Sequence, residues 1–314
     1  MTVDVLTIGE ALVSFRSPGP LAFGAAITPG LAGAESNVAI GLARLGHSVQ
    51  WLGRVGDDAF GGEIVRTLRG EGVEVDRVVV DGTAPTGLML LEQRTADLTR
   101  VEYHRAGSAG SRLSPEDLDP IAFEDVRSLH VTGITTAISA SAAATVQAAV
   151  ERASAAGAFV SLDVNHRARL WARGDATATL RPLLPHVSLL IASEDELDLV
   201  APGPEDEAVA SLLGGRVEQV AIKRGSDGAS LLTSDGRVDA AARAVTAIDT
   251  VGAGDAFCAG LISGHLDGLD PVGRLDRAVQ LGAWAVSTFG DWQGLPRRHD
   301  LVDLATHRPG ETIR

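Results

Sequence analysis

A glycine-rich turn places a carboxylate beside flexible backbone in the last third of the chain. Residues 248–260 read IDTVGAGDAFCAG, so Gly252, Ala253 and Gly254 directly precede Asp255. Glycines let several backbone N–H groups point at one spot, and the positive end of a following helix also attracts phosphate. A bound phosphate would repel the Asp255 carboxylate. A carboxylate at this position is explained if Asp255 takes a proton from a hydroxyl that attacks the phosphate. The alternative is a plain turn whose aspartate caps the helix.

The residues around the turn predict where it lies in the fold. Residues 244–249 have strand character, and apolar residues from 256 to 266 recur at roughly helical spacing. The turn is therefore expected where a strand leads into a helix. In open parallel sheets, ligands bind at such carboxyl ends of strands.

Strands and helices alternate along most of the chain. Continuous apolar strands between helices are typical of a parallel sheet covered on both faces, so we predict an α/β fold with a central, mostly parallel sheet. The predicted strands are 3–8, 49–54, 129–132, 159–164, 189–192 and 220–223, and the predicted helices are 35–45, 59–69, 141–155, 176–184 and 205–213.

Two segments depart from this alternation. Residues 78–107 contain strand, turn and strand without a helical period, and residues 11–29 have strand-and-loop character. These patterns indicate antiparallel strands outside the main sheet. We therefore predict a single domain over residues 1–314, with a small inserted β lid made of approximately 11–29 and 78–107.

Composition excludes several classes of protein. The chain has 314 residues and a formal net charge of −14, so nucleic acid and anionic membranes are not expected partners. A single cysteine, Cys258, excludes an intrachain disulfide framework and a cysteine-rich zinc site. P-loop, dinucleotide-binding and HExxH zinc motifs are absent from the sequence. We see no signal peptide or membrane span and expect a cytoplasmic protein.

Two separated motifs resemble those of a known family. Residues 249–257, DTVGAGDAF, are similar to the C-terminal signature of the PfkB-type, or ribokinase-like, carbohydrate kinases. Residues 31–46, LAGAESNVAIGLARLG, resemble the glycine-rich N-terminal signature of the same family. The order and spacing of the motifs, the strand–helix alternation and the inserted β segment also fit. The resemblance covers nearly the whole chain and implies a ribokinase-like three-layer fold.

The resemblance implies an ATP-dependent phosphotransferase that uses Mg²⁺. Asp255 would be the general base for a primary alcohol, and the N–H groups of Gly252, Ala253 and Gly254 would form an anion hole for the transferring phosphoryl group. Many members also use a monovalent cation such as K⁺, and Asp249 stands where that ion's carboxylate would be. The alternative for Asp249 is that it accepts backbone N–H bonds at the end of a strand.

Other positions match the family's nucleotide side. Ser193 and Glu196 correspond to an Asn-x-x-Glu element that holds Mg²⁺ and phosphates, with serine in place of asparagine, so Glu196 is the metal candidate, directly or through water. A solvated helix start is the alternative for this acidic run. Residues 223–228, KRGSDG, resemble a nucleotide-binding turn, and a plain hairpin turn is the alternative. Together, the ATP-binding candidates are Asn165, Arg167, Ser193, Lys223, Gly225, Gly228, Gly252 and Gly254.

Within the family, three segments resemble the kinases of 2-keto-3-deoxygluconate, also called 2-dehydro-3-deoxygluconate. These segments are 101–118, 162–171 and the GAESNVA run of the first signature. A sugar acid carries a carboxylate, which guanidinium groups bind in bidentate fashion. Arg105 and Arg167 are therefore candidates for the substrate carboxylate, although Arg167 could serve ATP instead. Tyr103, the only tyrosine, could lie against the sugar or be an ordinary lid aromatic.

The remaining substrate candidates are Gly33, Asn37 and Asp291. The alternative for Asp291 is a loop cap. Met89, where this subfamily often has an aromatic residue, and Ala32 in place of a first glycine both depart from the subfamily pattern on the sugar side. Two alternative functions are another sugar kinase of this fold, such as a fructokinase or ribokinase, and a non-catalytic sugar or nucleotide sensor. We expect a homo-oligomer whose small-molecule partners are ATP and the sugar acid.

Overall fold

One large sheet forms the centre of the computed structural model, which describes residues 2–95 and 98–301. Its strand order is β15-β14-β13-β12-β11-β10-β1-β4-β6. The strands from β6 to β13 run parallel, and β14 and β15 add an antiparallel edge. The strand bounds are β1 (Val3–Ile8), β4 (Val49–Leu52), β6 (Val73–Glu74), β10 (Val126–Thr132), β11 (Phe159–Asp163), β12 (Leu189–Ser193), β13 (Gln219–Lys223), β14 (Ala229–Thr233) and β15 (Gly236–Ala240).

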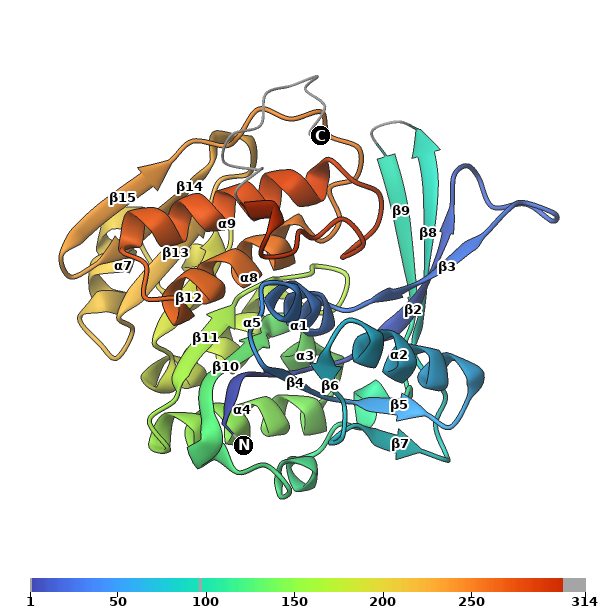
Figure 1. Ribbon diagram of the computed structural model, residues 1–314. Coiled ribbons are helices and arrows are strands. Elements are labelled where there is room, and N and C mark those ends of the chain that lie inside the picture. The colour runs from blue at the N-terminus through green and yellow to red at the C-terminus, as the bar shows by residue number, and fades with distance from the viewer. Residues whose placement is uncertain (1, 96–97, 302–314) are drawn as a thin grey trace.

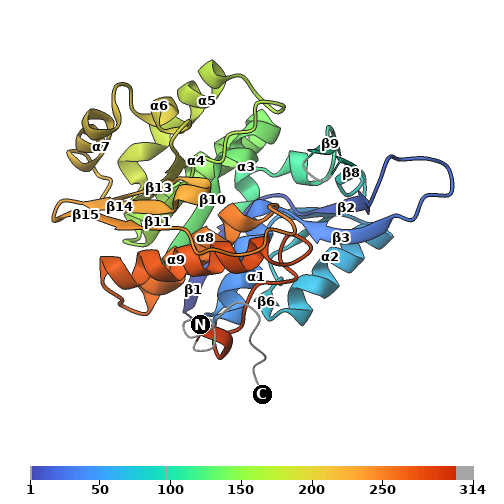
Figure 2. The ribbon, with the colours of Figure 1, turned by 90° about the horizontal axis from the view of Figure 1, so that it is seen from above.

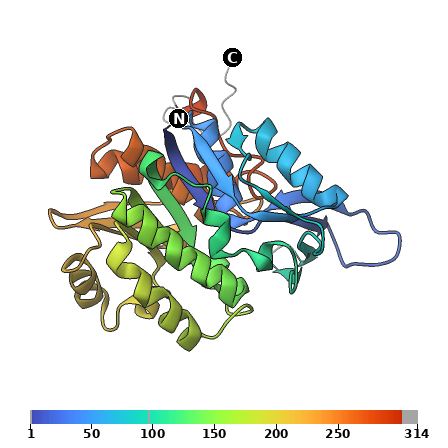
Figure 3. The same ribbon diagram turned by 90° about the horizontal axis from the view of Figure 1, so that it is seen from below.

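Helices cover both faces of this sheet (Figure 2). In β12, Leu190 and Ala192 pack into one apolar core, and Leu189 and Ile191 pack into the other. Such alternation makes the strand apolar throughout, because both faces are buried. One layer contains α4 (Ala140–Ala155), seen in front in Figure 3, with α5 (Arg173–Leu180), α6 (Leu197–Val200) and α7 (Glu205–Leu213). The other contains α1 (Ala34–Arg44), α2 (Ala59–Gly70), α8 (Ala253–Leu266) and α9 (Pro271–Val286).

A second sheet stands beside the main one (Figure 1). It has four strands in the order β3-β2-β8-β9, among the residues that the structure describes. Their bounds are β2 (Leu12–Ser17), β3 (Thr28–Ala32), β8 (Leu88–Thr95) and β9 (Leu98–His104). We call these four strands the lid sheet. They fall within or next to the two segments predicted as a lid, of which residues 96–97 lie outside the described part.

The lid segments differ from the prediction in two respects. Although β2 pairs antiparallel with β3, and β8 with β9, the two hairpins join through a parallel pairing of β2 with β8. The start of the second segment belongs elsewhere, because β7 (Val79–Asp81) pairs with β5 (Arg54–Gly56) in a separate two-stranded sheet. The lid sheet packs on the turn before α8, since Leu12, Met89 and Leu91 cluster with Val251.

The α/β architecture with a mostly parallel sheet is confirmed, but the strand predicted for 244–249 is wrong. This segment has no regular structure. The N–H groups of Ile248 and Asp249 donate to the carbonyl oxygen of Val286, at 2.7 and 3.3 Å, so the segment bonds to the end of α9 instead of a neighbouring strand. The helix predicted for 176–184 is also shorter, because α5 ends at Leu180 and a 3₁₀ helix follows. Within the described ranges, no helix has the length and apolar character needed to cross a membrane.

Candidate active site

A pocket of about 470 Å³ lies between the carboxyl ends of the parallel strands, the start of α8 and the lid sheet. Most of the site residues predicted from the sequence line it, although they come from distant parts of the chain. Ala253, Gly225, Gly228 and Asp249 do not line it. The predicted residues that do are Gly33, Asn37, Tyr103, Arg105, Asn165, Arg167, Ser193, Glu196, Lys223, Gly252, Gly254, Asp255 and Asp291.

The turn before α8 has a backbone that only glycine can follow. Gly252 is the N-cap residue of α8 and has a left-handed φ of 81°. A Cβ added there would lie 2.0 Å from the carbonyl oxygen of Asp291. The first N–H groups of a helix lack intrahelical acceptors, so the start of α8 can receive an anion at the pocket wall. Ala253 donates only a long 3.5 Å bond to the carbonyl oxygen of Thr250.

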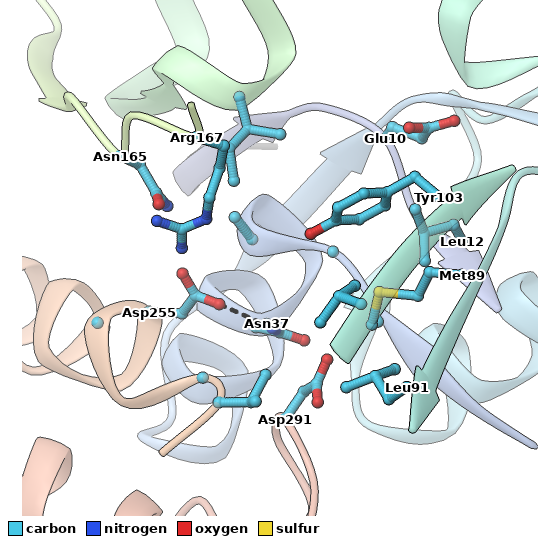
Figure 4. A pocket seen from close by; sticks show the side chains of 18 of the residues that line it. Glu10, Leu12, Asn37, Met89, Leu91, Tyr103, Asn165, Arg167, Asp255 and Asp291 are labelled. Atoms are coloured by element: carbon cyan, nitrogen blue, oxygen red, sulfur yellow. Dashed lines mark hydrogen bonds between the residues drawn. The ribbon is translucent and has the colours of Figure 1, made fainter. Parts of the chain in front are cut away.

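Asp255 lies in the first turn of α8 and does not cap the helix, because the N-cap is Gly252. Its side chain points into the pocket, where Arg167 approaches from the opposite wall (Figure 4). One carboxylate oxygen accepts a 2.8 Å hydrogen bond from Nδ2 of Asn37. The alternative that Asp255 is a helix cap therefore does not hold.

The surroundings of Asp255 favour its protonated form. Burial raises the pKa of Asp255 to about 7, the hydrogen bond from Asn37 opposes this rise, and the nearby Asp163 carboxylate adds to it. Arg167 acts in the opposite direction to Asp163. A carboxylate with this pKa can both accept and release a proton near neutral pH, as a general base must.

The start of α1 positions Asn37. Gly33 precedes the helix with a φ of 150°, and a Cβ there would lie 2.5 Å from the carbonyl oxygen of Glu10. The hydroxyl of Ser36 donates back to the carbonyl oxygen of Gly33 at 2.9 Å. Asn37 is 2% exposed, so its amide is fixed against Asp255 with little freedom to move.

A buried ion pair lies behind the helix start. Lys223 Nζ donates to both carboxylate oxygens of Asp163, at 2.7 and 2.9 Å. Burial lowers the pKa of Lys223, but Asp163 offsets this effect and the net change is upward. The sulfur of Cys258 lies 3.4 Å from a carboxylate oxygen of Asp163, and burial raises the pKa of the Cys258 thiol. The sequence analysis gave Asp163 no role, although it lies in the segment 162–171 and ends β11 two residues before the predicted Asn165.

Glu196 connects the segments at the ends of β11 and β12. Its carboxylate accepts the backbone N–H of His166 at 2.6 Å and that of Ser193 at 2.8 Å. The glycines of the predicted nucleotide turn, Gly225 and Gly228, lie in the hairpin between the antiparallel strands β13 and β14. This placement matches the hairpin alternative, while Lys223 at the start of that turn does reach the pocket.

On the lid side, Arg105 is already paired. Its Nε donates to Glu10 at 2.6 Å, and the hydroxyl of Ser108 donates to the other Glu10 oxygen at 2.6 Å. The Arg105 guanidinium lies 5.4 Å from the centre of the Tyr103 ring. Glu10 lines the pocket and is 2% exposed. It was missed from the sequence, although a carboxylate directly after the first strand and a glycine is a usable signal.

Asp249 lies outside the pocket. It accepts the backbone N–H of Val251 at 3.0 Å and a guanidinium N–H of Arg16 at 2.6 Å. This geometry matches the alternative in which Asp249 orders the backbone, and it does not favour a cation site. Among residues 2–95 and 98–301, no group of three or more His, Cys, Asp or Glu side chains is arranged to hold a metal ion.

Comparison with known sequences identifies related proteins along nearly the full chain. A family profile described as pfkB family carbohydrate kinase matches residues 4–298. The 2-dehydro-3-deoxygluconokinase of Bacillus subtilis is 36% identical, over 97% of this chain and 96% of that protein. The enzyme of the same name from Thermoproteus tenax is 33% identical, over 96% and 94%. A fructokinase from Klebsiella pneumoniae is 32% identical, over 95% of each chain.

Solved structures share the fold. A PfkB protein from Polaromonas sp. JS666 has a TM-score of 0.86 and 33% identity, over 96% of this chain and 99% of that one. A putative ribokinase II from E. coli, in complex with ATP and Mg²⁺, has a TM-score of 0.89 and 25% identity, over 97% and 99%. The predicted ribokinase-like fold is therefore confirmed.

The raised pKa of Asp255 predicts a pH-dependent stability cost. Its pKa rises from 3.8 to about 7 on folding, so the folded state holds this proton more tightly than the unfolded chain does. The cost is absent below about pH 4 and complete above about pH 7. Asp255→Asn should therefore be more stable than the wild type at about pH 8, by roughly 1–4 kcal/mol, and the gain should shrink toward about pH 4.

Urea unfolding of both proteins across this pH range measures the effect. Asp206→Asn, which removes an exposed carboxylate from α7, is the control and should show no comparable gain. Equal stability of Asp255→Asn and wild type at alkaline pH would contradict the assigned environment.

Proposed function

Since this chain belongs to the pfkB family of carbohydrate kinases, we propose that it transfers the γ-phosphoryl group of ATP to a primary hydroxyl of a sugar acid. The first candidate for this sugar acid is 2-keto-3-deoxygluconate. The two 2-dehydro-3-deoxygluconokinases, at 36 and 33% identity, support this substrate. The fructokinase, at 32%, keeps a neutral sugar as the second candidate.

The observation that carries the proposal is the placement of Asp255. Its carboxylate lies in the first turn of a helix whose N-terminus opens into the pocket, with a pKa of about 7. Binding alone gives no reason to put a carboxylate beside a phosphate, because the two charges repel each other. A base for the attacking hydroxyl does give that reason, which argues against a silent sensor.

In the proposed reaction, the acceptor hydroxyl lies against Asp255. The hydroxyl oxygen bonds to the γ-phosphorus while the hydroxyl proton passes to the Asp255 carboxylate. At the same time, the bond between the γ-phosphorus and the β–γ bridging oxygen of ATP breaks, and ADP leaves. Asn37 holds the carboxylate in place through the 2.8 Å hydrogen bond. Charge on the transferring group is stabilised by the N–H groups of Gly252, Ala253 and Gly254 at the positive end of α8.

The nucleotide side follows from the opposite half of the pocket. Asn165, Arg167, Ser193 and Lys223 lie at the ends of β11, β12 and β13, beside the start of α8. Both Glu196 oxygens already accept a backbone N–H, so Glu196 fits Mg²⁺ through the ion's water shell, as is usual for this metal. Bound with ATP, Mg²⁺ would neutralise phosphate charge. The relative bound to ATP and Mg²⁺ supports both ligands.

The sugar side combines charge with an apolar wall. Leu12, Met89 and Leu91 form an apolar cluster on the lid sheet, and Tyr103 points toward the pocket centre (Figure 4). Because Glu10 offsets the charge of Arg105, the exposed Arg167 is the stronger attractor for an anion at long range. Arg105 can still donate to a carboxylate that enters beside Tyr103. Its guanidinium is already held in position by Glu10 before the substrate arrives.

Two further expectations stay predictions, since a homo-oligomer and a cytoplasmic location both rest on the sequence. The monovalent cation expected at Asp249 is not part of the proposed reaction, because Arg16 already contacts that carboxylate.

Loss of the base should slow turnover without loss of ATP binding. A general base typically contributes about 10²–10⁴-fold in rate, so kcat of Asp255→Asn should fall by at least the lower figure. In the wild type, kcat/KM should rise with pH and level off above about 7, because only the ionised carboxylate accepts the proton. Coupled ADP-release assays and ATP titration measure both effects. Near-normal turnover of the variant would refute the assignment, and Asp206→Asn serves as the unaffected control.

The arginines should determine the preference for an acid. Truncating one partner of a desolvated charge pair costs on the order of 2–5 kcal/mol, so Arg105→Ala should lose far more kcat/KM on 2-keto-3-deoxygluconate than on fructose. Arg167→Ala, tested in parallel, shows whether the acid or ATP uses that guanidinium. Arg100→Ala on β9 is the matched control, because its guanidinium is exposed and lies 3.9 Å from Glu102. Equal losses on both sugars would assign Arg105 to lid structure.

The lid sheet should close over the sugar. A poised phosphoryl donor must be kept from water, and the lid forms one wall of the pocket. Hydrogen exchange in β2, β8 and β9 should therefore slow when the sugar acid binds, while α4, on the far side of the main sheet, serves as the internal reference. Unchanged exchange in the lid strands would show that they are not a substrate lid.

A further inference from the structure

Arg16 links the lid sheet to the turn before α8. It lies on β2, and its guanidinium donates to Asp249 Oδ2 at 2.6 Å and to Asp291 Oδ1. The two acidic side chains are 10% and 4% exposed and the Arg16 side chain is 21% exposed. One partly buried cation thus bridges the buried Asp291 carboxylate and the partly buried Asp249 carboxylate, which come from segments about 40 residues apart in sequence.

The donors around Asp249 leave poor conditions for an alkali cation. Besides Arg16, the carboxylate accepts the backbone N–H of Val251 at 3.0 Å and that of Gly290 at 3.3 Å. Hard cations bind oxygen atoms, whereas an ion placed here would face the positive ends of N–H groups and a guanidinium. The residues present therefore do not fit a monovalent cation at Asp249.

The same contact reaches the pocket wall. Asp291 lines the pocket, and its carbonyl oxygen packs so closely on Gly252 that no Cβ would fit. Burial raises the pKa of Asp291, the Arg16 charge opposes this rise, and the Asp249 carboxylate adds to it. Without a positive charge here, two carboxylates would repel each other directly behind the anion-binding turn.

We propose that the Arg16 guanidinium serves as a built-in counter-ion for Asp249 and Asp291 in place of a bound alkali cation, so that catalysis by this protein does not depend on K⁺ or Na⁺. The inference rests on the kinase function proposed above. Arg16 is a positioning residue in this account, since it acts on the pocket through Asp291 and the turn before α8.

The test compares cations at constant ionic strength. Wild-type kcat/KM for 2-keto-3-deoxygluconate and wild-type Tm should be equal in the chlorides of K⁺, Na⁺ and tetramethylammonium. Arg16→Ala should lose at least about tenfold in kcat/KM in tetramethylammonium. Added K⁺ or non-denaturing guanidinium should restore most of this loss and raise the Tm of the variant. Arg16→Lys, which keeps one positive charge, should need no added cation.

The fold should survive the substitution, because a second contact joins the lid sheet to the segment that carries Asp291: Trp292 Nε1 donates to the carbonyl oxygen of Leu31 on β3 at 3.1 Å. Arg100→Ala is the matched control from the lid sheet and should match the wild type in every salt. A wild type that requires K⁺ would overturn the proposal. So would an Arg16→Ala variant that is unaffected in tetramethylammonium, or one that neither K⁺ nor guanidinium restores.

The Tm arm separates this proposal from the proposed function. If the wild type phosphorylates none of the sugars tested, the kinase substrate is wrong, yet Tm still reports the counter-ion. In that case, a Tm of Arg16→Ala that rises with K⁺ or guanidinium and not with tetramethylammonium supports the counter-ion role. A Tm that does not respond selectively overturns it.

Discussion

The hydrogen bond between Asn37 and Asp255 joins two parts of the chain that are 218 residues apart. For it to form, α1 must begin directly after Gly33 and α8 directly after Gly252, and each of these N-cap glycines has a backbone position where a Cβ would clash. The two helices must also lie side by side on one face of the sheet, which their shared apolar core ensures. The amide then holds one oxygen of the base, so the other can meet the substrate.

Charge is the second organising constraint, because this acidic chain gathers carboxylates at its pocket. Asp163 is held by Lys223, Asp291 by Arg16 and Glu10 by Arg105. Asp255 differs from these three, since its hydrogen-bond partner is a neutral amide. Burial raises the pKa of Asp255 to about 7, and the hydrogen bond from Asn37 offsets only part of this rise.

Much of this arrangement could be predicted from the sequence, since β1 and α7 have the predicted bounds and most predicted site residues share one pocket. Local patterns specify such elements because burial repeats along the strand or helix. The partners of Arg105 and Asp249 could not be predicted, because Glu10 and Arg16 are distant from them in sequence and were not matched to a motif. Asp163, the partner of Lys223, lies in the matched segment 162–171, but the motif alone did not indicate its pairing with a residue 60 positions away. The strand expected at 244–249 does not form. Its apolar residues Val245 and Ile248 are exposed, and its backbone hydrogen-bonds to the end of α9.

The burial of Cys258 has a practical consequence. It is the only cysteine of the chain and is 0% exposed, and its raised pKa disfavours the thiolate that reacts with electrophiles. Maleimide dyes and nitroxide spin labels therefore have no reactive native target in the folded protein. A cysteine introduced on the solvent side of the lid sheet would be the only site to take a label, which makes single-molecule fluorescence or electron spin resonance of lid motion feasible without altering the helix that carries the base.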